Sequence, residues 1–245
     1  MIDDVAAVIV AAGSSSRMNG KKKEYEVLPD FHSSAAGEKP LTVLGSAARA
    51  FASCNAVSVI VIVIPENGEA DARDALPHDF IHNCGKKIIF AHGGSVRRDS
   101  VYNGLSLLKE YSPSIALIHD GARPWIKKEL IEKIIKAARI HGAVIPAVPL
   151  VDTPKEIVQT GGENEGFVIR HLKRGEILAA QTPQGFKYPE ILKAHEKAAI
   201  LAAEKNIEYT DDAEVWAEII GPVAFISGDP ENKKITFPGD LVCSE

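Results

Sequence analysis

The sequence is poor in cysteine. Cys54, Cys84 and Cys243 are the only three among 245 residues, an odd number without paired spacing. Small secreted domains that depend on disulfides carry many more cysteines, and structural zinc sites bring cysteines in close pairs. The sequence therefore predicts neither a disulfide framework nor a zinc site, and a reducing cytoplasm is the expected compartment.

The chain also has no excess of positive charge and no long apolar run. Lys and Arg number 28 against 33 Asp and Glu, which gives a net charge of −5. A general nucleic-acid-binding domain is strongly basic as a whole or over one face, so no nucleic-acid partner is expected. No apolar stretch approaches the roughly 20 residues of a membrane span, and the acidic start MIDD is unlike the basic start of a signal peptide. We expect no membrane association.

What is present is an ordinary globular composition, 45% hydrophobic and 25% charged, with enough residues for a sizeable core. Five short, continuous apolar runs predict buried parallel strands at residues 5–11, 57–64, 87–93, 114–121 and 142–149. Helical spacing predicts helices at residues 40–54, 98–111, 127–142 and 188–206. This alternation predicts one α/β domain over residues 1–245, Rossmann-like, with a doubly wound and mostly parallel sheet.

Two segments interrupt the alternation. From residue 149 to 173, Pro, Thr and Gly punctuate short strand-like runs, which predicts an arm of short strands outside the main sheet. From Glu26 to Glu38, the Pro, Ser, Gly and charged residues predict a mobile surface loop.

The first predicted strand runs into a small-residue turn followed by cations. Gly13 begins the turn, and Arg17, Lys21, Lys22 and Lys23 follow it. Open α/β sheets bind ligands beyond the carboxyl ends of their strands, and small residues let backbone N–H groups approach a phosphate closely. The spacing matches neither the Walker A loop nor GxGxxG. A polyphosphate site is predicted, with a solvated basic turn as the alternative.

Seven motifs carry a resemblance to a known family. AAGSSSRM at residues 11–18 is similar to the AAGxGxRM signature of cytidylyltransferases and related nucleotidyltransferases. It is followed, in order, by GGSVRRDSVYNGL, HDGARPWI, VPLVDTPKE, RGEILAAQTPQGF, TDDAEVWAE and NKKITFPGDL. Together the motifs resemble the 2-C-methyl-D-erythritol 4-phosphate cytidylyltransferase family over nearly the whole chain. Because the sequence stops soon after GDL, we expect an enzyme without the second domain of bifunctional relatives.

The resemblance implies a reaction and a cofactor. CMP would pass from CTP to 2-C-methyl-D-erythritol 4-phosphate in the non-mevalonate isoprenoid pathway, with Mg²⁺ required and pyrophosphate released. A substrate phosphate oxygen attacks the α-phosphorus of CTP, so two anions must be brought together. Such chemistry needs cations and positioned hydrogen-bond donors more than a protein nucleophile or base.

The resemblance assigns the catalytic cations. Arg17 would hold the β- and γ-phosphates, Lys23 would bridge the attacking phosphate and the α-phosphate, and Lys234 would lie near the α-phosphate. The family motif has Pro-Lys-Gln where this chain has Lys-Lys-Glu, so Lys22 stays open as the alternative to Lys23. Neighbours on a strand face opposite ways, so Lys233 is expected to point away from the site.

The other site residues fall into two groups. Nucleotide binding is expected at Ala11, Ala12, Gly13, Ser14, Gly94, Ser95, Ser100 and Asp120. Substrate binding is expected at Arg123, Thr153, Arg174 and Thr182. No protein ligands for a resident metal are predicted. Because Thr153 lies in the arm, which in the family reaches across a dimer, a homodimer is expected.

Several of these roles have structural alternatives. Asp120 would bind ribose hydroxyls or magnesium-bound water, or it would only cap the next turn. The glycines before Ser95 would form only a turn, and Ser100 would be a hydroxyl at a helix N-terminus. His119 is expected to pack, and Asp211 and Asp212 are expected to cap or to form local ion pairs.

Three other functions compete with the family's reaction. A cytidylyltransferase for another polyol phosphate, such as ribitol 5-phosphate, shares the phosphate loop and HDGARP-like elements. A Rossmann oxidoreductase would need GxGxxG and a ribose-binding acid, and the chain supplies neither. A non-catalytic nucleotide-binding module is supported only by the altered Lys-Gln motif and by the 26–38 segment.

Overall fold

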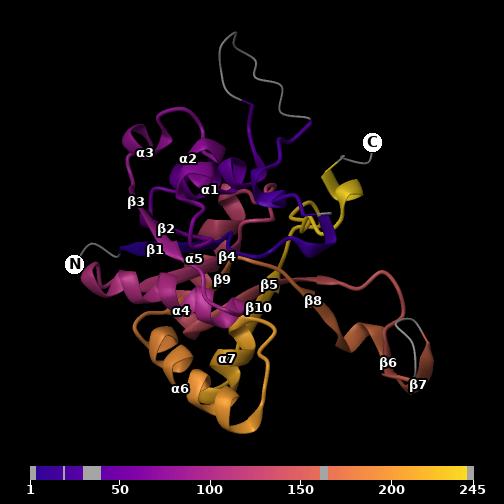
Figure 1. The fold of residues 1–245 in the computed structure, drawn as a ribbon. Coiled ribbons are helices and arrows are strands. Elements are labelled where there is room, and N and C mark those ends of the chain that lie inside the picture. The colour runs from indigo at the N-terminus through magenta and orange to yellow at the C-terminus, as the bar shows by residue number, and fades with distance from the viewer. Residues whose placement is uncertain (1–3, 19, 30–39, 161–164, 242–245) are drawn as a thin grey trace.

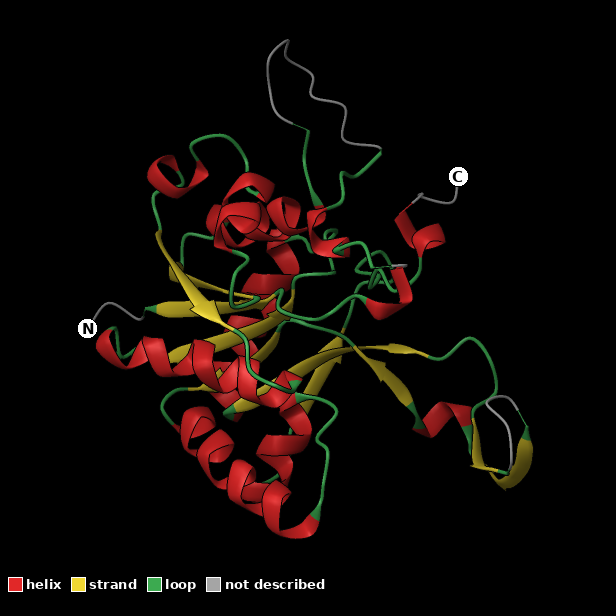
Figure 2. Cartoon of the chain, in the orientation of Figure 1, coloured by secondary structure: helices red, strands yellow, loops and turns green. Residues whose placement is uncertain are grey.

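The fold is built around one twisted sheet. The computed structural model describes residues 4–18, 20–29, 40–160 and 165–241. Within them, eight strands form a sheet of order β10-β5-β9-β4-β1-β2-β3, with β8 paired to β5 (Figures 1 and 2). The strands are β1 (Val5–Val10), β2 (Val57–Ile64), β3 (Lys87–His92), β4 (Ile115–Asp120), β5 (Ala143–Pro149), β8 (Leu178–Ala180), β9 (Gln184–Lys187) and β10 (Ala224–Ser227).

All five predicted strands are present and the sheet is mostly parallel, as expected. β1 lies between β2 and β4 and is parallel to both. β9 runs antiparallel between β4 and β5, and β8 is antiparallel to β5. The sequence did not predict β8, β9 or β10, because strands of three or four residues leave too short an apolar pattern.

Helices cover both faces of the sheet. They are α1 (Val43–Ser53), α2 (Glu69–Ala75), α3 (Phe80–Asn83), α4 (Arg97–Leu107), α5 (Lys128–His141), α6 (Glu190–Lys205) and α7 (Asp212–Ile219). Alternate residues of β1 belong to two different cores: Ala7 and Ile9 pack with α1, α2 and α5, and Ala6 and Val8 pack with α4, α6 and α7. Because strand side chains alternate between faces, continuously apolar strands need cover on both sides. The doubly wound architecture is confirmed.

The ends of α1 and α5 have local causes in the sequence. Thr42 caps α1, its hydroxyl accepting the N–H of Gly45 at 2.9 Å. α5 ends at Gly142, whose φ of +85° lies in the left-handed region that glycine adopts without strain.

The arm stands away from the main sheet. β6 (Lys155–Gln159) and β7 (Gly166–His171) pair antiparallel in a separate two-stranded sheet, well outside the body of the molecule (Figure 1). Its apolar side chains face outward: Val151 is 85% exposed and Phe167 is 67% exposed. The short strands expected between residues 149 and 173 are therefore present. Most of the loop expected at 26–38 lies outside the described residues.

Candidate active site

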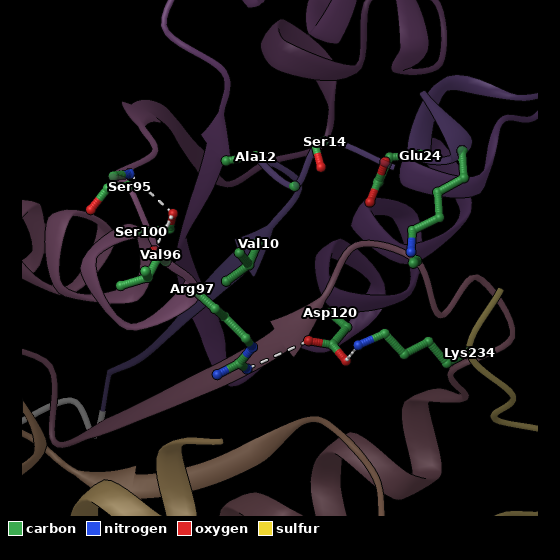
Figure 3. Close-up of a pocket in the computed structure, with 14 residues that line it drawn as sticks. Val10, Ala12, Ser14, Glu24, Ser95, Val96, Arg97, Ser100, Asp120 and Lys234 are labelled. Carbon is green, nitrogen blue, oxygen red and sulfur yellow. Dashed lines mark hydrogen bonds and ion pairs between the residues drawn. The ribbon is translucent and has the colours of Figure 1, made fainter. Parts of the chain in front are cut away.

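A cavity of about 480 Å³ opens where β1 and β4 end, beside the turn that precedes α4 (Figure 3). Both strands point their carboxyl ends at it, which is where parallel sheets leave a crevice. The residues that line it are Val10, Ala12, Gly13, Ser14, Lys23, Glu24, Gly94, Ser95, Val96, Arg97, Ser100, Asp120, Ala122 and Lys234.

Many predicted site residues, distant in sequence, meet in this cavity. The phosphate-loop turn, the GGSVRRDS motif, the HDGARP motif and the NKKIT motif each contribute to the lining. The predicted residues found there are Ala12, Gly13, Ser14, Lys23, Gly94, Ser95, Ser100, Asp120 and Lys234.

Asp120, the last residue of β4, organises the charges. Its Oδ2 lies 2.8 Å from Lys234 Nζ, and its Oδ1 lies 3.4 Å from Arg97 Nη2 (Figure 3). Arg123 Nε also lies 3.7 Å from Oδ2. Burial by itself would raise the pKa of Asp120, but Arg97 and Lys234 hold that pKa well below its usual range. The ionised carboxylate in turn holds the Lys234 ammonium at the cavity wall.

Arg97 is a site residue that the sequence did not single out. It begins α4, and its Nη2 lies 2.8 Å from Oδ2 of Asp212, a side chain that is 1% exposed. Although burial opposes the charge, Asp212 and then Asp120 raise the pKa of Arg97. The next residue, Arg98, instead pairs with Asp99 at 2.6 Å. The GGSVRRDS motif contains both arginines next to each other. Only the orientation of α4 places Arg97, and not Arg98, in the cavity wall.

The structure separates the two candidate lysines of the loop. Lys23 lines the cavity. Lys22 donates its ammonium to the Gly13 carbonyl, and its Nζ lies 5.9 Å from the centroid of the Tyr25 ring. Burial lowers the pKa of Lys23, and the neighbouring Glu24 carboxylate partly offsets that effect.

The turn before α4 serves both as a turn and as cavity wall. The Ser100 hydroxyl accepts the Gly94 N–H at 3.0 Å and donates to the Val96 carbonyl at 3.2 Å. A Cβ at Gly94 would lie 2.4 Å from Asp99 Cβ, and one at Gly93 would lie 2.4 Å from Ala12 Cβ. Ser100 thus lies in the first turn of α4, where its hydroxyl ties the turn to the helix, and it also lines the cavity. Its nucleotide-binding role stays a prediction.

A chain of hydrogen bonds fixes the end of β4 from behind. The Asp120 N–H donates to Thr182 Oγ1 at 3.0 Å, and that hydroxyl lies 3.0 Å from His119 Nδ1. His119 Nε2 lies 3.2 Å from the Arg123 carbonyl, which can only accept. The arrangement thus selects the neutral imidazole with its proton on Nε2, and burial lowers the pKa of His119 to about 4. The expected packing role of His119 is confirmed.

Four predicted site residues of the body do not line the cavity. Ala11 is fully buried in the core. The Arg17 side chain is exposed, with its guanidinium carbon 5.9 Å from the centroid of the Phe237 ring. Arg123 donates from Nη1 to the Asn232 carbonyl at 2.8 Å, and the buried Thr182 belongs to the hydrogen-bond chain already described. Arg123 and Thr182 therefore lie behind Asp120 as supports.

Two predicted residues, one on the arm and one directly after it, do not line the cavity of their own chain. Arg174, exposed in η4 (Arg174–Glu176), donates from Nη1 to the Val151 carbonyl at 2.7 Å. Thr153 is exposed between β5 and β6. Neither lines the cavity that holds Lys234.

Lys234 is the lysine at the cavity, as the resemblance implies, but the strand alternation expected at Lys233 and Lys234 is wrong. Residues 232–236 form no strand, so strand alternation does not apply. The segment is instead pinned by the Ile235 N–H, which donates to the Ala122 carbonyl at 2.9 Å. Asn232 reinforces this by donating from Nδ2 to the Thr182 carbonyl at 2.7 Å.

The chemistry of the site is that of cations around anions. Lys23, Arg97 and Lys234 line the cavity together with the carboxylates of Glu24 and Asp120. Within the described ranges, no three His, Cys, Asp or Glu side chains are grouped as a metal site would require. The cavity thus suits a polyphosphate, whose charge its cations would neutralise.

No helix among the described residues is long and apolar enough to cross a membrane.

Comparisons with known proteins agree with this chemistry. The family model described as 2-C-methyl-D-erythritol 4-phosphate cytidylyltransferase matches residues 5–245. Curated proteins of that name from Dehalococcoides mccartyi and Pelotomaculum thermopropionicum are each 38% identical, over 99% and 100% of this chain and 95% and 94% of their own length. A crystal structure of 4-diphosphocytidyl-2C-methyl-D-erythritol synthase from Anaerococcus prevotii superposes with a TM-score of 0.75 at 26% identity, covering 98% of this chain and 93% of that one.

Proposed function

Since the chain belongs to the 2-C-methyl-D-erythritol 4-phosphate cytidylyltransferase family, we propose a role for each part of its cavity in that family's reaction. The enzyme transfers CMP from CTP to 2-C-methyl-D-erythritol 4-phosphate in isoprenoid precursor biosynthesis. The products are 4-diphosphocytidyl-2-C-methyl-D-erythritol and pyrophosphate. One observation carries the assignment of roles: Lys23 and Lys234 line one cavity, and Asp120 holds Lys234 in place.

The lysines act on the reacting phosphates. An oxygen of the substrate phosphate forms the new bond to the α-phosphorus of CTP, and the bond from that phosphorus to the oxygen bridging to the β-phosphate breaks. In the transition state, negative charge is spread over the non-bridging oxygens of the α-phosphorus and the oxygen that leaves with pyrophosphate. Fixed ammonium groups beside these oxygens therefore stabilise the transition state more than the ground state. Lys234 and Lys23 supply those groups, and Arg17, whose side chain is exposed, holds the β- and γ-phosphates.

The nucleoside lies against small residues of the loop after β1 and of the turn before α4. Ala12, Gly94 and Ser95 leave room for backbone groups to approach a base and ribose closely. Arg97 is a cation next to this wall, but two carboxylates hold it, so it acts by fixing Asp120 rather than by binding phosphate.

Magnesium fits this site as a companion of CTP. Mg²⁺ keeps several waters and is commonly held by substrate phosphates with few protein ligands. Because Asp120 is already engaged by Lys234 and Arg97, the phosphates of CTP would hold the ion. When bound, it would neutralise phosphate charge and favour departure of pyrophosphate.

The sugar phosphate is bound with help from a second subunit. Thr153 and Arg174 do not line the cavity of their own chain. The arm exposes Val151, Phe167 and Ile169. Exposed apolar side chains in such number favour a partner surface. A homodimer in which each arm completes the partner's site accounts for both observations. The scarcity of cysteine supports a cytoplasmic enzyme.

The test is pyrophosphate release from CTP and Mg²⁺ by the purified protein. 2-C-methyl-D-erythritol 4-phosphate and ribitol 5-phosphate are compared at matched concentrations, with Lys234→Ala as the inactive control. A higher kcat/KM with the erythritol phosphate is expected. Preference for ribitol 5-phosphate would reassign the residues proposed to bind the sugar phosphate. CTP binding without turnover on either compound would contradict the catalytic roles.

A further inference from the structure

The loop after β1 and the turn that carries Lys23 are joined by a buried side-chain contact. Ser15 donates its hydroxyl to Oε2 of Glu24 at 3.1 Å, and the same hydroxyl oxygen lies 3.4 Å from the Lys23 backbone N–H. Both side chains belong to buried residues, Ser15 at 9% and Glu24 at 4% exposure. Glu24 points toward the same cavity as Asp120 (Figure 3).

From this contact we propose that Ser15 and Glu24 are positioning residues for the reaction, forming a latch that holds Lys23 at the cavity. The latch is defined as the side chains of these two residues. The proposal rests on the role proposed above for Lys23.

The backbone of Ser15 shows that its place in the loop is specified. Its φ of +51° lies in the left-handed region, where a residue other than glycine is disfavoured. Such a conformation persists where surrounding contacts hold it, and residues of this kind cluster at functional sites. Here the contacts that hold it are the Glu24 carboxylate and the turn beginning at Lys23.

A second contact engages Lys22, the neighbour of Lys23. Lys22 donates to the Gly13 carbonyl, and its ammonium also faces the Tyr25 ring. With Lys22 tied to the loop and Glu24 tied to Ser15, the residue between them, Lys23, lines the cavity. The latch and the Lys22 contact together therefore leave Lys23, rather than Lys22, at the cavity.

The Glu24 carboxylate also acts on the charge of Lys23. Burial lowers the pKa of Lys23; Glu24 and Asp120 oppose this, whereas Lys234 and Arg17 add to it. Among these groups, Glu24 has the largest effect after burial, so it helps to keep the ammonium protonated. Position and charge can be separated, because glutamine keeps an oxygen that accepts the Ser15 hydroxyl and loses the negative charge.

The experiment compares Glu24→Ala, Glu24→Gln, Ser15→Ala and Lys23→Ala, alone and in the double variant Lys23→Ala/Glu24→Ala. Glu26→Ala is the matched control, because it removes the same charge from a side chain that does not line the cavity. Steady-state kcat and KM for both substrates are measured across pH, and thermal midpoints verify folding. Losing a positioned group costs up to about 10²-fold in kcat.

Three results are expected. Glu24→Ala and Ser15→Ala lower kcat more than they raise the KM for CTP. Glu24→Gln recovers most of the kcat that Glu24→Ala loses. In this variant the alkaline limb of the pH profile of kcat moves to lower pH, because Lys23 has lost the anionic neighbour that raises its pKa. In the Lys23→Ala background, Glu24→Ala causes no further loss of kcat.

Other results would overturn the latch. Wild-type kcat in both Glu24→Ala and Ser15→Ala would show that Lys23 needs no such support. An undiminished effect of Glu24→Ala in the Lys23→Ala background would show that Glu24 acts independently of that lysine. If Glu24→Ala does not fold, Ser15→Ala decides. Near-normal turnover by Lys23→Ala would instead refute the proposed role of Lys23 itself, which is a distinguishable failure.

Discussion

At the scale of single residues, the ionised Asp120 decides how the site is arranged. Its carboxylate is nearly buried and touches cations from three separate parts of the chain: Arg97, Arg123 and Lys234. A buried charge is tolerated when it is paired and becomes costly when a partner is lost. The lysine held by Asp120 is therefore fixed before substrates arrive, so that little reorganisation is needed in the transition state.

The neighbouring lysines of the NKKIT motif give a direct comparison. Lys234→Ala is expected to lower kcat by about 10² to 10³-fold, because a positioned cation is removed from the reacting phosphates. Lys233→Ala is expected to stay within a few-fold of wild type, since that side chain is exposed and does not line the cavity. Pyrophosphate release measures both. Equal losses of kcat in the two variants would mean that turnover depends on the NKKIT segment as a whole rather than on the Lys234 ammonium.

His119 makes stability depend on pH in a defined window. Its pKa falls from about 6.5 in the unfolded chain to about 4 in the folded one, so between these values the unfolded state binds a proton that the folded state does not. The free energy of unfolding therefore falls as pH decreases from 6.5 toward 4, by about 3 kcal/mol. Urea denaturation at a series of pH values measures this slope.

The control for that slope is His119→Gln, which cannot take up the proton. Its stability is lower at neutral pH, because the fit to Thr182 and Arg123 is lost, but it should vary less between pH 6.5 and 4. An unchanged slope would assign the dependence to another group.

At the scale of secondary-structure elements, the site depends on how closely α4 approaches the sheet. Gly104, in the middle of α4, faces β1 and β2: an added Cβ would lie 2.6 Å from Val8 Cγ1 and 2.9 Å from Val63 Cγ2. The start of the same helix carries Arg97 and, one turn on, Ser100. Close packing at Gly104 thus sets the depth of the helix whose first turn forms the cavity wall.

Gly104→Ala is expected to lower the free energy of unfolding by about 1–3 kcal/mol, because overpacking outweighs the gain in helix propensity. Chemical denaturation provides the measurement. Gly175→Ala is the control, since nothing lies within 4 Å of the position an added Cβ would take. A more stable Gly104→Ala protein would mean that α4 shifts outward freely, in which case the KM for CTP should rise.

At the scale of the whole molecule, a compact catalytic body carries an arm that exposes apolar residues. The cavity lies at the strand ends of the body, and the arm that carries β6 and β7 stands away from the main sheet (Figure 1). If Thr153 and Arg174 bind the sugar phosphate as proposed, a second copy would complete the site through a two-fold interface in which each arm meets the partner's body.

Mixed dimers test that arrangement. Lys234→Ala damages the body of a site and Arg174→Ala damages the arm, so a dimer containing one of each has one intact site if arms act across the interface. Random mixing of the two inactive proteins by unfolding and refolding should restore about a quarter of wild-type activity, because half of the dimers are mixed and each holds one working site of two. No restoration would mean that each arm serves its own chain.

Local patterns in the sequence were sufficient for much of the fold and for part of the site. Continuous apolar runs predicted the five longer parallel strands, and small residues with cations after β1 predicted an anion site at its end. β8, β9 and β10 are too short to leave such a pattern. Arg97 and Glu24 were also missed, because nothing local distinguishes a side chain that enters a cavity from its neighbour. The contacts of Arg123 and Thr182 with Asp120 likewise leave no local pattern.

The sequence by itself determined the α/β alternation, the family and the motifs that supply cations, because these follow from residue type, order and short-range spacing. Only the tertiary structure decided which cation reaches the cavity. Lys23 lines the cavity, whereas Lys22 donates to the Gly13 carbonyl. Lys234 is held by the pairing of its ammonium with Asp120 and by the hydrogen bond from the Ile235 N–H to the Ala122 carbonyl. The physical reason is that these choices depend on hydrogen bonds and ion pairs between residues far apart along the chain, and such contacts exist only once the sheet has brought its strand ends together.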